Sequence, residues 1–273
     1  MGDTLQEAIE SVMRQIDDEY EVILVDDGST DSSVQIATQL AKTYWNLHLI
    51  SLQRDPNRRL GQTRNISIQE SSGEWCIFHL DTDDEIGSHI REFVSAVTEL
   101  SDLMPRDVLF SGQQIHMAKK QFLLSRGPFR NIYRGEDRDL YMRLVKNSEW
   151  IVIKHKRFIR RLKRSWLKLL VKNIRDNFDQ SINDLQNNVG SVEYLKVSFR
   201  NRNYLSYKII LFRLATLPFA ARKAKLRGEF QNHDYPTHSE FLEYRKLHTK
   251  SFSAWLKIYG QKIPSKLNSE IFD

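Results

Sequence analysis

Four carboxylates directly follow one short apolar segment, and their spacing is the strongest indication in the chain of a site that could carry out chemistry. The segment Trp75–Leu80 is apolar apart from His79, which predicts a strand buried on both faces. Carboxylates so close in sequence repel one another, and no Lys or Arg lies nearby in the sequence to offset them. Hard oxygen ligands of this kind suit Mg²⁺ or Mn²⁺, which also take phosphate oxygens as ligands. The four are Asp81, Asp83, Asp84 and Glu85.

A plainer interpretation of these acids is a solvated turn. Asp84 or Ser88 would then cap the helix predicted from Ile90 to Leu100. Short acidic motifs have many false matches, so both interpretations stand at this point.

A second acidic pair, Asp26 and Asp27, ends the predicted strand Val22–Val25. In an open α/β sheet, ligands bind beyond the carboxyl ends of the strands, so both acidic groups should open on one edge. A carboxylate there can accept hydrogen bonds from a nucleobase or from ribose hydroxyls. We favour ligand contact for Asp27, whereas Asp31 is expected to cap the next helix.

Two further positions belong to the same edge of the predicted sheet. Arg64 lies one turn into a helix predicted over residues 62–71, where a guanidinium could pair with a diphosphate. The alternative for Arg64 is an exposed helical arginine. Glu136 and Asp137 follow a glycine-rich aromatic loop and begin another helix. They are either first-turn acids favoured by the helix dipole or a general base that faces the site.

Helices and strands alternate through the first half of the chain. This pattern predicts an α/β fold, a mostly parallel sheet with helices on both faces. The single cysteine, Cys76, excludes a disulfide framework and a cysteine metal site, and fits a reducing compartment. We find no signal peptide and no apolar stretch long enough to cross a bilayer. The predicted helices begin at residues 4, 34, 62 and 90, and the predicted strands at residues 22, 47, 75 and 107.

Charge divides the chain into two halves. Residues 1–150 contain 16 Lys and Arg against 25 Asp and Glu, a net charge of −9, whereas residues 151–273 contain 25 against 10, a net charge of +15. We therefore predict two regions, 1–153 and 154–273, the second basic and mainly helical. Two basic amphipathic helices are predicted, one from about Ile159 to Ile174 and one over 204–227. Such helices suit contact with an anionic membrane surface. Alternatively, they pack on the first region and expose their basic face to solvent. Positive charge is the only feature that supports nucleic-acid binding.

Taken together, these stretches resemble the family 2 glycosyltransferases, which have the GT-A fold. The resemblance covers about residues 3 to 153, and the order and rough spacing of the motifs agree. The residues that carry it are Val25-Asp26-Asp27-Gly28-Ser29-Thr30-Asp31, Leu60-Gly61-Gln62-Thr63-Arg64-Asn65, Ser72-Gly73-Glu74-Trp75, Leu80-Asp81-Thr82-Asp83-Asp84 and Gly135-Glu136-Asp137.

The resemblance implies a role for each matching residue. Asp27 would contact the nucleobase, Ser29 would help to bind the nucleotide-sugar, and Arg64 would lie near the nucleobase and diphosphate. Asp83 and Asp84 would hold the ribose and Mn²⁺ or Mg²⁺, with Asp81 assisting in donor binding. Asp137, with Glu136 beside it, would be the catalytic base. The implied reaction is an inverting transfer from a UDP- or GDP-sugar to a glycan or lipid-linked acceptor, at the cytoplasmic face of the cell membrane and without nucleic acid.

Two departures from the family qualify this expectation. Members usually begin with a strand of the Val-Ile-Ile-Pro-Thr-Tyr-Asn type before the first helix, and this sequence opens with Met1-Gly2-Asp3. We therefore expect a missing central strand and two exposed strand edges, from a late start-site assignment or a truncation. The interval between Asp84 and Glu136 is also short, and no Gln-x-x-Arg-Trp motif is present, which disfavours a processive synthase. The rival hypothesis is a non-catalytic relative that binds or scaffolds.

Overall fold

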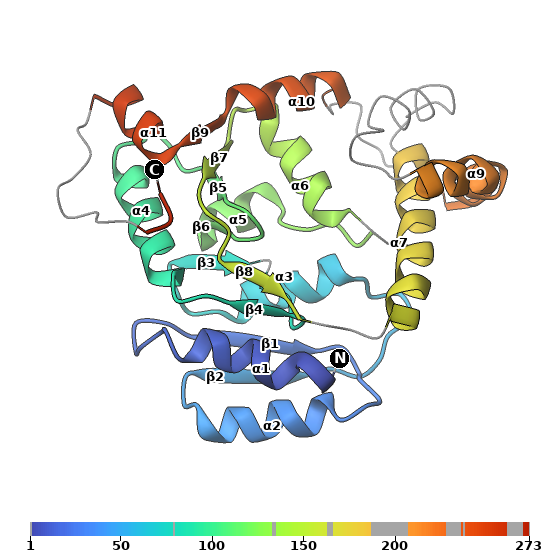
Figure 1. The fold of residues 1–273 in the computed structure, drawn as a ribbon, viewed down its shortest axis with the longest axis horizontal. Helices are drawn as coiled ribbons and strands as arrows, with labels where there is room; N and C mark the ends of the chain where they lie inside the picture. Colours follow the sequence, from blue (N-terminus) through green and yellow to red (C-terminus); the bar gives the residue numbers. More distant parts are fainter. Residues whose placement is uncertain are drawn as a thin grey trace.

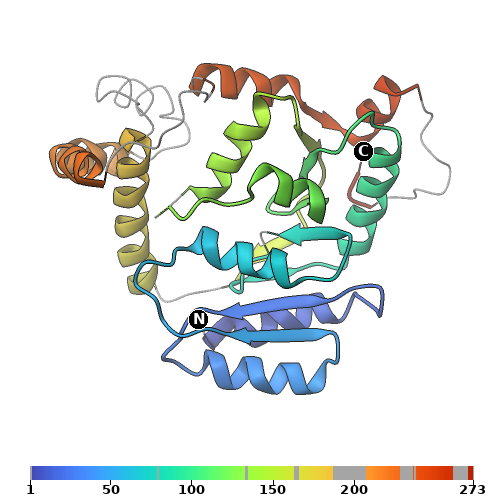
Figure 2. The same ribbon diagram turned by 180° about the vertical axis from the view of Figure 1, so that it is seen from behind.

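The computed structural model describes residues 2–78, 80–132, 135–162, 166–186, 207–227, 236, 238–260 and 270–272. Its strands form three groups, and helices cover both faces of the larger sheet (Figures 1 and 2). The predicted α/β class, a mostly parallel sheet with helices, is confirmed.

The first group is a parallel pair, β1 (Val22–Asp26) and β2 (Leu47–Ser51). Two helices, α1 (Gly2–Met13) and α2 (Ser33–Thr43), pack on this pair. Leu5 and Ile9 of α1 meet Leu40 of α2 in a small core, because each helix places its apolar residues three or four positions apart. Helix α1 begins two residues before the predicted start at residue 4.

The larger sheet has the strand order β3-β6-β5-β7-β9. Strands β5, β7 and β9 are parallel, whereas β6 runs antiparallel to both β3 and β5. Strand β9 comes from the basic C-terminal region, so that region contributes to the sheet; the boundary at residue 153 itself stays a prediction. The strands are β3 (Trp75–Phe78), β5 (Leu109–Ser111), β6 (His116–Lys119), β7 (Trp150–Lys154) and β9 (Thr249–Ser251).

Two apolar cores cover the faces of this sheet. On one face, Phe93 and Leu100 of α4 (Ile90–Asp102) pack with Leu256 of α11 (Phe252–Ile258). On the other, the core joins residues of α3 (Leu60–Glu70), α5 (Lys120–Arg126), α6 (Glu136–Val145) and α10 (His238–Leu247). Helices therefore cover both faces of the sheet that contains β3, the strand that precedes the acidic residues 81–85.

The third group corrects the sequence prediction for the start of the basic half. Residues 159–161 form strand β8 (Ile159–Arg161), which pairs antiparallel with β4 (Asp84–Ile86), whereas the apolar spacing predicts the start of a helix there. Ile159 and Leu162 are both buried. Two apolar residues three positions apart can belong to a helix or to the end of a strand, so the apolar spacing alone does not distinguish the two structures. Pairing with β4 decides the outcome.

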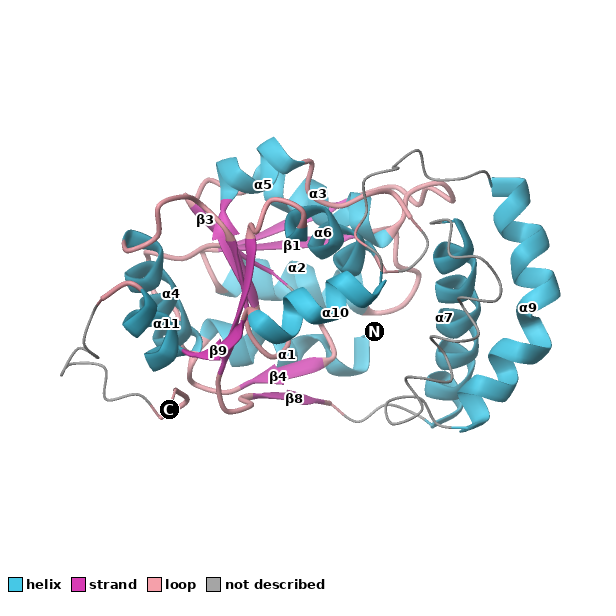
Figure 3. Ribbon diagram, turned by 90° about the horizontal axis from the view of Figure 1, so that it is seen from above, coloured by secondary structure: helices cyan, strands magenta, loops and turns pink. Residues whose placement is uncertain are grey.

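Two long helices stand at one end of the molecule (Figure 3). Helix α7 (Trp166–Gln186) packs against α9 (Tyr207–Arg227) through Ile182, Ala220 and Ala224. The helix predicted over 204–227 therefore agrees with α9. In the part of the chain that the structure describes, no helix is long and apolar enough to span a membrane.

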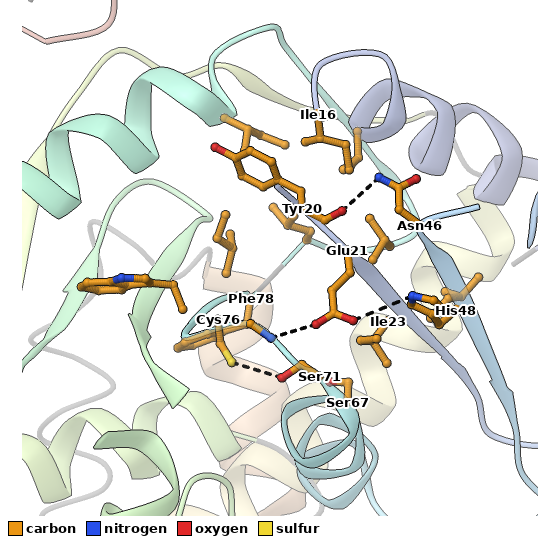
Figure 4. A pocket seen from close by; sticks show the side chains of 18 of the residues that line it. Ile16, Tyr20, Glu21, Ile23, Asn46, His48, Ser67, Ser71, Cys76 and Phe78 are labelled. Atoms are coloured by element: carbon orange, nitrogen blue, oxygen red, sulfur yellow. Dashed lines mark hydrogen bonds and ion pairs between the residues drawn. The ribbon is translucent and has the colours of Figure 1, made fainter. Parts of the chain in front are cut away.

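A cleft separates β1 from β3, which leaves an edge of each strand without a partner strand among the described residues (Figure 4). Its volume is about 700 Å³, and apolar side chains of α1, β1, α3 and β3 line it. The expected gap in the sheet is thus present. A five-residue strand, at about 3.3 Å per residue with about 4.8 Å between strands and about 10 Å between layers, fills roughly 800 Å³. The cleft volume is therefore of the same order as the volume of one strand.

Hydrogen bonds at both ends of the cleft keep the two strands aligned. Glu21, just before β1, accepts hydrogen bonds from Ser72 Oγ at 2.8 Å and from the Gly73 amide at 2.9 Å, just before β3. At the opposite end, Thr4 Oγ1 of α1 donates to the Thr82 carbonyl beyond β3 at 2.9 Å. Strands β1 and β3 therefore point the same way, and the acidic segments that follow them open on one edge.

We expect a larger side chain in the cleft to stabilise the fold. Ala8 of α1 is buried and lines the cleft, so Ala8→Leu should raise the free energy of unfolding by about 1–2 kcal/mol in urea denaturation. Ala96 of α4 is fully buried in a filled core, so Ala96→Leu should lower it by about 1–3 kcal/mol. Equal losses from both substitutions would show that the cleft closes in solution.

Candidate active site

The segment after β1 places Asp27 beside an arginine that the sequence did not single out. Arg58 Nε donates to Asp27 Oδ1 at 2.6 Å, from the loop before α3. Asp26 instead stabilises the turn, because its Oδ2 accepts from the Ser29 amide at 3.2 Å. Gly28 has φ +71, and a Cβ there would lie 2.7 Å from the backbone nitrogen of Arg54, so the turn needs glycine.

Asp31 lies just beyond this turn and interacts with the start of α2. Its Oδ1 accepts a hydrogen bond from the Ser33 amide at 3.0 Å, which satisfies one free N–H at the helix start. The N-cap residue is Ser32, so Asp31 supports the helix start from one position before the cap and is not the cap itself. Asp27, by contrast, pairs with Arg58 and makes no capping contact among those the structure describes for this segment.

Arg64 connects two of the predicted motifs. Its Nη1 donates to Glu136 Oε1 at 2.6 Å, and its Nη2 lies 3.7 Å from Asp81 Oδ1. The guanidinium also stands over the Phe129 ring, 5.5 Å from the ring centre. Arg64 is mostly buried by these contacts, so the alternative of a plain exposed helical arginine is wrong.

The loop that contains Phe129 is fixed on α3 by the residue next to Arg64. Asn65 donates from Nδ2 to the Phe129 carbonyl at 2.7 Å and accepts from the Phe129 amide at 2.9 Å. A Cβ on Gly61 would lie 2.2 Å from the Arg130 carbonyl oxygen, so glycine is needed for this close approach. The Arg64-Asn65 pair thus holds the aromatic loop against the site.

Three carboxylates beyond β3 meet around one guanidinium. Arg161 Nε donates to Asp84 Oδ1 at 2.9 Å, its Nη1 lies 3.2 Å from Asp83 Oδ2, and its Nη2 lies 3.4 Å from Asp81 Oδ2. Asp83 and Asp84 are 2% and 1% exposed, and α4 begins after His89. The interpretation of a solvated capping turn is therefore wrong, and the positive charge missing from the nearby sequence comes from 77 residues away.

Burial and charge oppose each other at this cluster. Burial raises the pKa of Asp84 above its usual value, and the hydrogen bond from Arg161 only partly offsets this. Burial would lower the pKa of Arg161, but Asp83 and the two other carboxylates outweigh it, and that pKa is raised. The guanidinium therefore stays charged among the acids.

The start of α6 presents two adjacent acids in different surroundings. Gly135 precedes the helix in the left-handed conformation, with φ 81°. Glu136 is 4% exposed and bound to Arg64, whereas Asp137 is half-buried and accepts from the Arg138 amide at 2.8 Å. Of the two, Asp137 has the access that a proton acceptor needs.

A buried polar chain holds α6 on the sheet. The hydroxyl of Tyr141 lies 3.0 Å from His116 Nε2, and His116 Nδ1 lies 2.7 Å from Ser111 Oγ, which also accepts from Trp150 Nε1 at 2.6 Å. The Tyr141 ring stacks on Trp150, with ring centres 4.9 Å apart. Burial raises the pKa of Tyr141 well above its ordinary value, so its hydroxyl keeps its proton. These contacts fix where Glu136 and Asp137 lie.

The donor chemistry of the acidic cluster fits a divalent cation, because carboxylate oxygens are the ligands that Mg²⁺ and Mn²⁺ prefer. Its present arrangement is that of an ion-pair cluster. Among the residues the structure describes, no three acidic, histidine or cysteine side chains converge on a preformed metal position. Asp81, Asp83 and Asp84 could serve as ligands after Arg161 moves away.

Residues 2–161 match the profile described as glycosyl transferase family 2, which covers more than half of the chain. The chain belongs to glycosyl transferase family 2. This assignment confirms the resemblance found in the sequence, and the matched range contains every motif that carried it.

Two relatives from bacteria share part of this family 2 domain. A poly(ribitol-phosphate) β-glucosyltransferase of Bacillus spizizenii is 39% identical over 89 residues, which are 32% of this chain and 14% of that protein. A cholesterol galactosyltransferase of Borreliella burgdorferi is 30% identical over 132 residues, which are 48% of this chain and 35% of that protein. The chain thus matches only a minor part of either relative's length.

One solved glycosyltransferase structure has a similar fold. A mannosyltransferase of Pyrobaculum calidifontis, in complex with GDP-mannose and Mn²⁺, matches with a TM-score of 0.53 at 15% identity. The match covers 83% of this chain and 70% of that chain. It supports the GT-A architecture of this family 2 domain.

Five of the predicted site residues form one network in the structure. Arg64 contacts both Asp81 and Glu136, and Arg161 links Asp81 to Asp83 and Asp84. The catalytic, nucleotide-binding and metal-binding roles implied for all of these residues stay predictions, as do those for Asp27, Ser29 and Asp137. Sequence reasoning missed Arg58 and Arg161, because one lies in a polar loop and the other in a strand where the pattern predicts a helix.

We expect the two acids of α6 to differ in their effect on stability. Glu136→Gln removes the buried partner of Arg64 and should lower the free energy of unfolding in urea by about 3 kcal/mol. Asp137→Asn removes a half-exposed charge from a helix start and should cost less than about 1 kcal/mol. Equal losses of stability in the two variants would contradict this account, because they would show that Glu136 and Asp137 are not buried to different degrees in solution.

Proposed function

We propose that this protein transfers a sugar from a nucleotide-sugar donor to an acceptor hydroxyl. The observation that supports this proposal best is the pair of contacts that Arg64 makes with Asp81 and Glu136. These acids belong to the two motifs to which the family resemblance assigns donor binding and catalysis. The chain's membership of family 2 supports the reaction class.

In the proposed complex, the nucleotide lies at the carboxyl edge of the sheet. Asp27 and Ser29 face the nucleoside from the segment after β1, and Asp83 and Asp84, assisted by Asp81, bind the ribose from the segment after β3. Arg64 lies between these segments and α6, where its charge can hold a diphosphate oxygen. A UDP- or GDP-sugar meets these requirements.

Asp83 and Asp84 are the proposed ligands of Mn²⁺ or Mg²⁺. Such an ion, when bound, would offset the charge that develops on the leaving diphosphate. The donor chemistry of these carboxylates supports the assignment, and the mannosyltransferase that shares the fold was solved with Mn²⁺.

Asp137 is the proposed catalytic base, with inversion at the anomeric carbon. Its carboxylate takes the proton of the acceptor hydroxyl while that oxygen forms a bond to the anomeric carbon. The bond to the nucleoside diphosphate breaks on the opposite face, and the electron pair leaves with the diphosphate. Glu136 is better suited to holding Arg64, because it is buried and already paired.

For the acceptor we propose a cell-surface glycan, polymer or lipid-linked sugar. The support is the likeness to the poly(ribitol-phosphate) β-glucosyltransferase over 89 residues. The rival proposal, a non-catalytic binding or scaffolding protein, is favoured by one observation, the cleft in the middle of the sheet. Donor binding distinguishes the two.

Calorimetric titration with UDP, and then with GDP, tests the proposed function. We expect binding that strengthens at least about tenfold with Mn²⁺ and that loses this gain in Asp83→Asn, because a ligand charge is removed. Asp102→Asn, at the exposed end of α4, is the matched control and should bind like the unmodified protein. A folded protein that binds neither nucleotide would favour the rival.

We further propose that the outer face of α9 contacts the anionic inner surface of the cell membrane. Leu211, Phe219 and Leu226 are 64%, 69% and 79% exposed, and their spacing places them on one face of the helix. Ala220 and Ala224 occupy the face towards α7. The helix contains six Lys and Arg and no acid, so its charge complements anionic lipid.

Sedimentation with phosphatidylcholine vesicles, with and without phosphatidylglycerol, tests this surface. We expect binding to the anionic vesicles alone, and the double variant Phe219→Glu/Leu226→Glu should weaken it about tenfold or more, since two large apolar side chains no longer enter the lipid. The matched double variant Leu247→Glu/Ile258→Glu changes exposed apolar residues elsewhere and should bind normally. Equal binding by both double variants would overturn the proposal.

A further inference from the structure

We propose that Arg161 is the resident counter-cation of Asp81, Asp83 and Asp84, and that a divalent cation binds these carboxylates only in exchange for its guanidinium. The inference rests on the proposed function, which supplies the divalent cation. It assigns to Arg161 a positioning role that regulates when the site can take up metal.

The contacts of the guanidinium support this exchange. Its nitrogens lie 2.9 Å from Asp84, 3.2 Å from Asp83 and 3.4 Å from Asp81, so it spans all three carboxylates. A metal bound by the same oxygens would lie about 2.0–2.6 Å from them, within the space that the guanidinium takes. Two cations that close would also repel each other strongly where the surroundings are partly buried.

Charge explains why some cation must be present. The three carboxylates carry up to three negative charges, and two of them are almost fully buried. Buried charges without a partner are strongly unfavourable. Arg161 meets this need before any metal arrives, and it keeps the carboxylates grouped.

The structure lets the guanidinium leave without opening the core. The Arg161 side chain is 39% exposed, whereas Asp83 and Asp84 lie beneath it at 2% and 1%. The backbone of β8 is held separately, since Arg161 is in register with Asp84 and the Leu162 amide donates to the Asp83 carbonyl at 2.8 Å. A change of side-chain rotamer is therefore enough to uncover the acids.

The neighbouring arginine provides a matched control on the same strand. Arg160 is in register with Glu85 and pairs with it, and its side chain is 74% exposed. Both variants at these positions remove one positive charge from β8. They differ in whether that charge lies among the three carboxylates.

The experiment measures Mn²⁺ affinity from the electron paramagnetic resonance signal of free Mn²⁺, on the full chain and without nucleotide. Arg161→Gln should bind Mn²⁺ at least about tenfold more tightly than the unmodified protein, because the competing cation is gone. Arg160→Gln should change affinity less than about threefold. Arg161→Lys keeps the positive charge but loses the planar guanidinium that contacts several carboxylates at once. Its Mn²⁺ affinity should lie between those of Arg161→Gln and the unmodified protein.

A second readout separates exchange from a merely structural role. Without metal, Arg161→Gln should melt at a lower temperature than Arg160→Gln, and Mn²⁺ should raise its melting temperature more than that of the unmodified protein. If Arg161→Gln does not fold without metal, the comparison of Arg161→Lys with the unmodified protein decides between the two roles. Unchanged or weaker Mn²⁺ binding in the Arg161 variants would overturn the inference.

The same titration separates this inference from the proposed function. Tight Mn²⁺ binding that does not depend on residue 161 would refute the exchange and leave the proposed metal site in place. No Mn²⁺ binding by any variant would refute the exchange and the metal ligands, while UDP or GDP binding would still support the transferase.

Discussion

The mutual repulsion of the acids beyond β3 is the constraint on which the rest of the site depends. Asp83 and Asp84 are almost fully buried, so a cation must neutralise their charge. Arg161 does this from β8, and the pairing of β8 with β4 brings it there. The small antiparallel sheet β4-β8 thus places a positive charge beside the acidic segment. Arg64 does the same for Glu136 on the opposite side, so two arginines from distant segments hold the acidic groups in place.

The cleft places a different constraint on the molecule. Strands β1 and β3 flank it without a strand between them in the described part of the chain, so no β-ladder aligns the segments that follow them. Glu21 holds the amino ends together, and the start of α1 reaches from the Asp31 segment to Thr82 at the carboxyl ends. Asp27 and the β3 acids are thus kept on one edge, although the sheet between them is interrupted. These contacts therefore help to maintain the edge at which the acidic segments meet.

Much of the fold could be predicted because its signals are local. Apolar periodicity identified the helices and strands of the first half, and the abrupt change from apolar to acidic residues located the sheet edge. Arg161 could not be found in this way. Its partners lie 77 to 80 residues away, and the spacing of Ile159 and Leu162 suits both a helix and a strand. Short apolar runs become strands or helices according to their neighbours, and the neighbour here, β4, is itself a three-residue strand. Arg58 was missed for a related reason, because a polar loop gives no pattern that points to Asp27.

The most direct test of this account is a crystal structure of the protein grown with UDP and Mn²⁺, with manganese located by its anomalous scattering. The account predicts a manganese peak bound by Asp83 and Asp84 and in contact with the diphosphate. The Arg161 guanidinium should then have moved away from Asp84, while β8 keeps its pairing with β4. A structure with nucleotide bound, Arg161 still hydrogen-bonded to Asp84 and no manganese beside these carboxylates would contradict it.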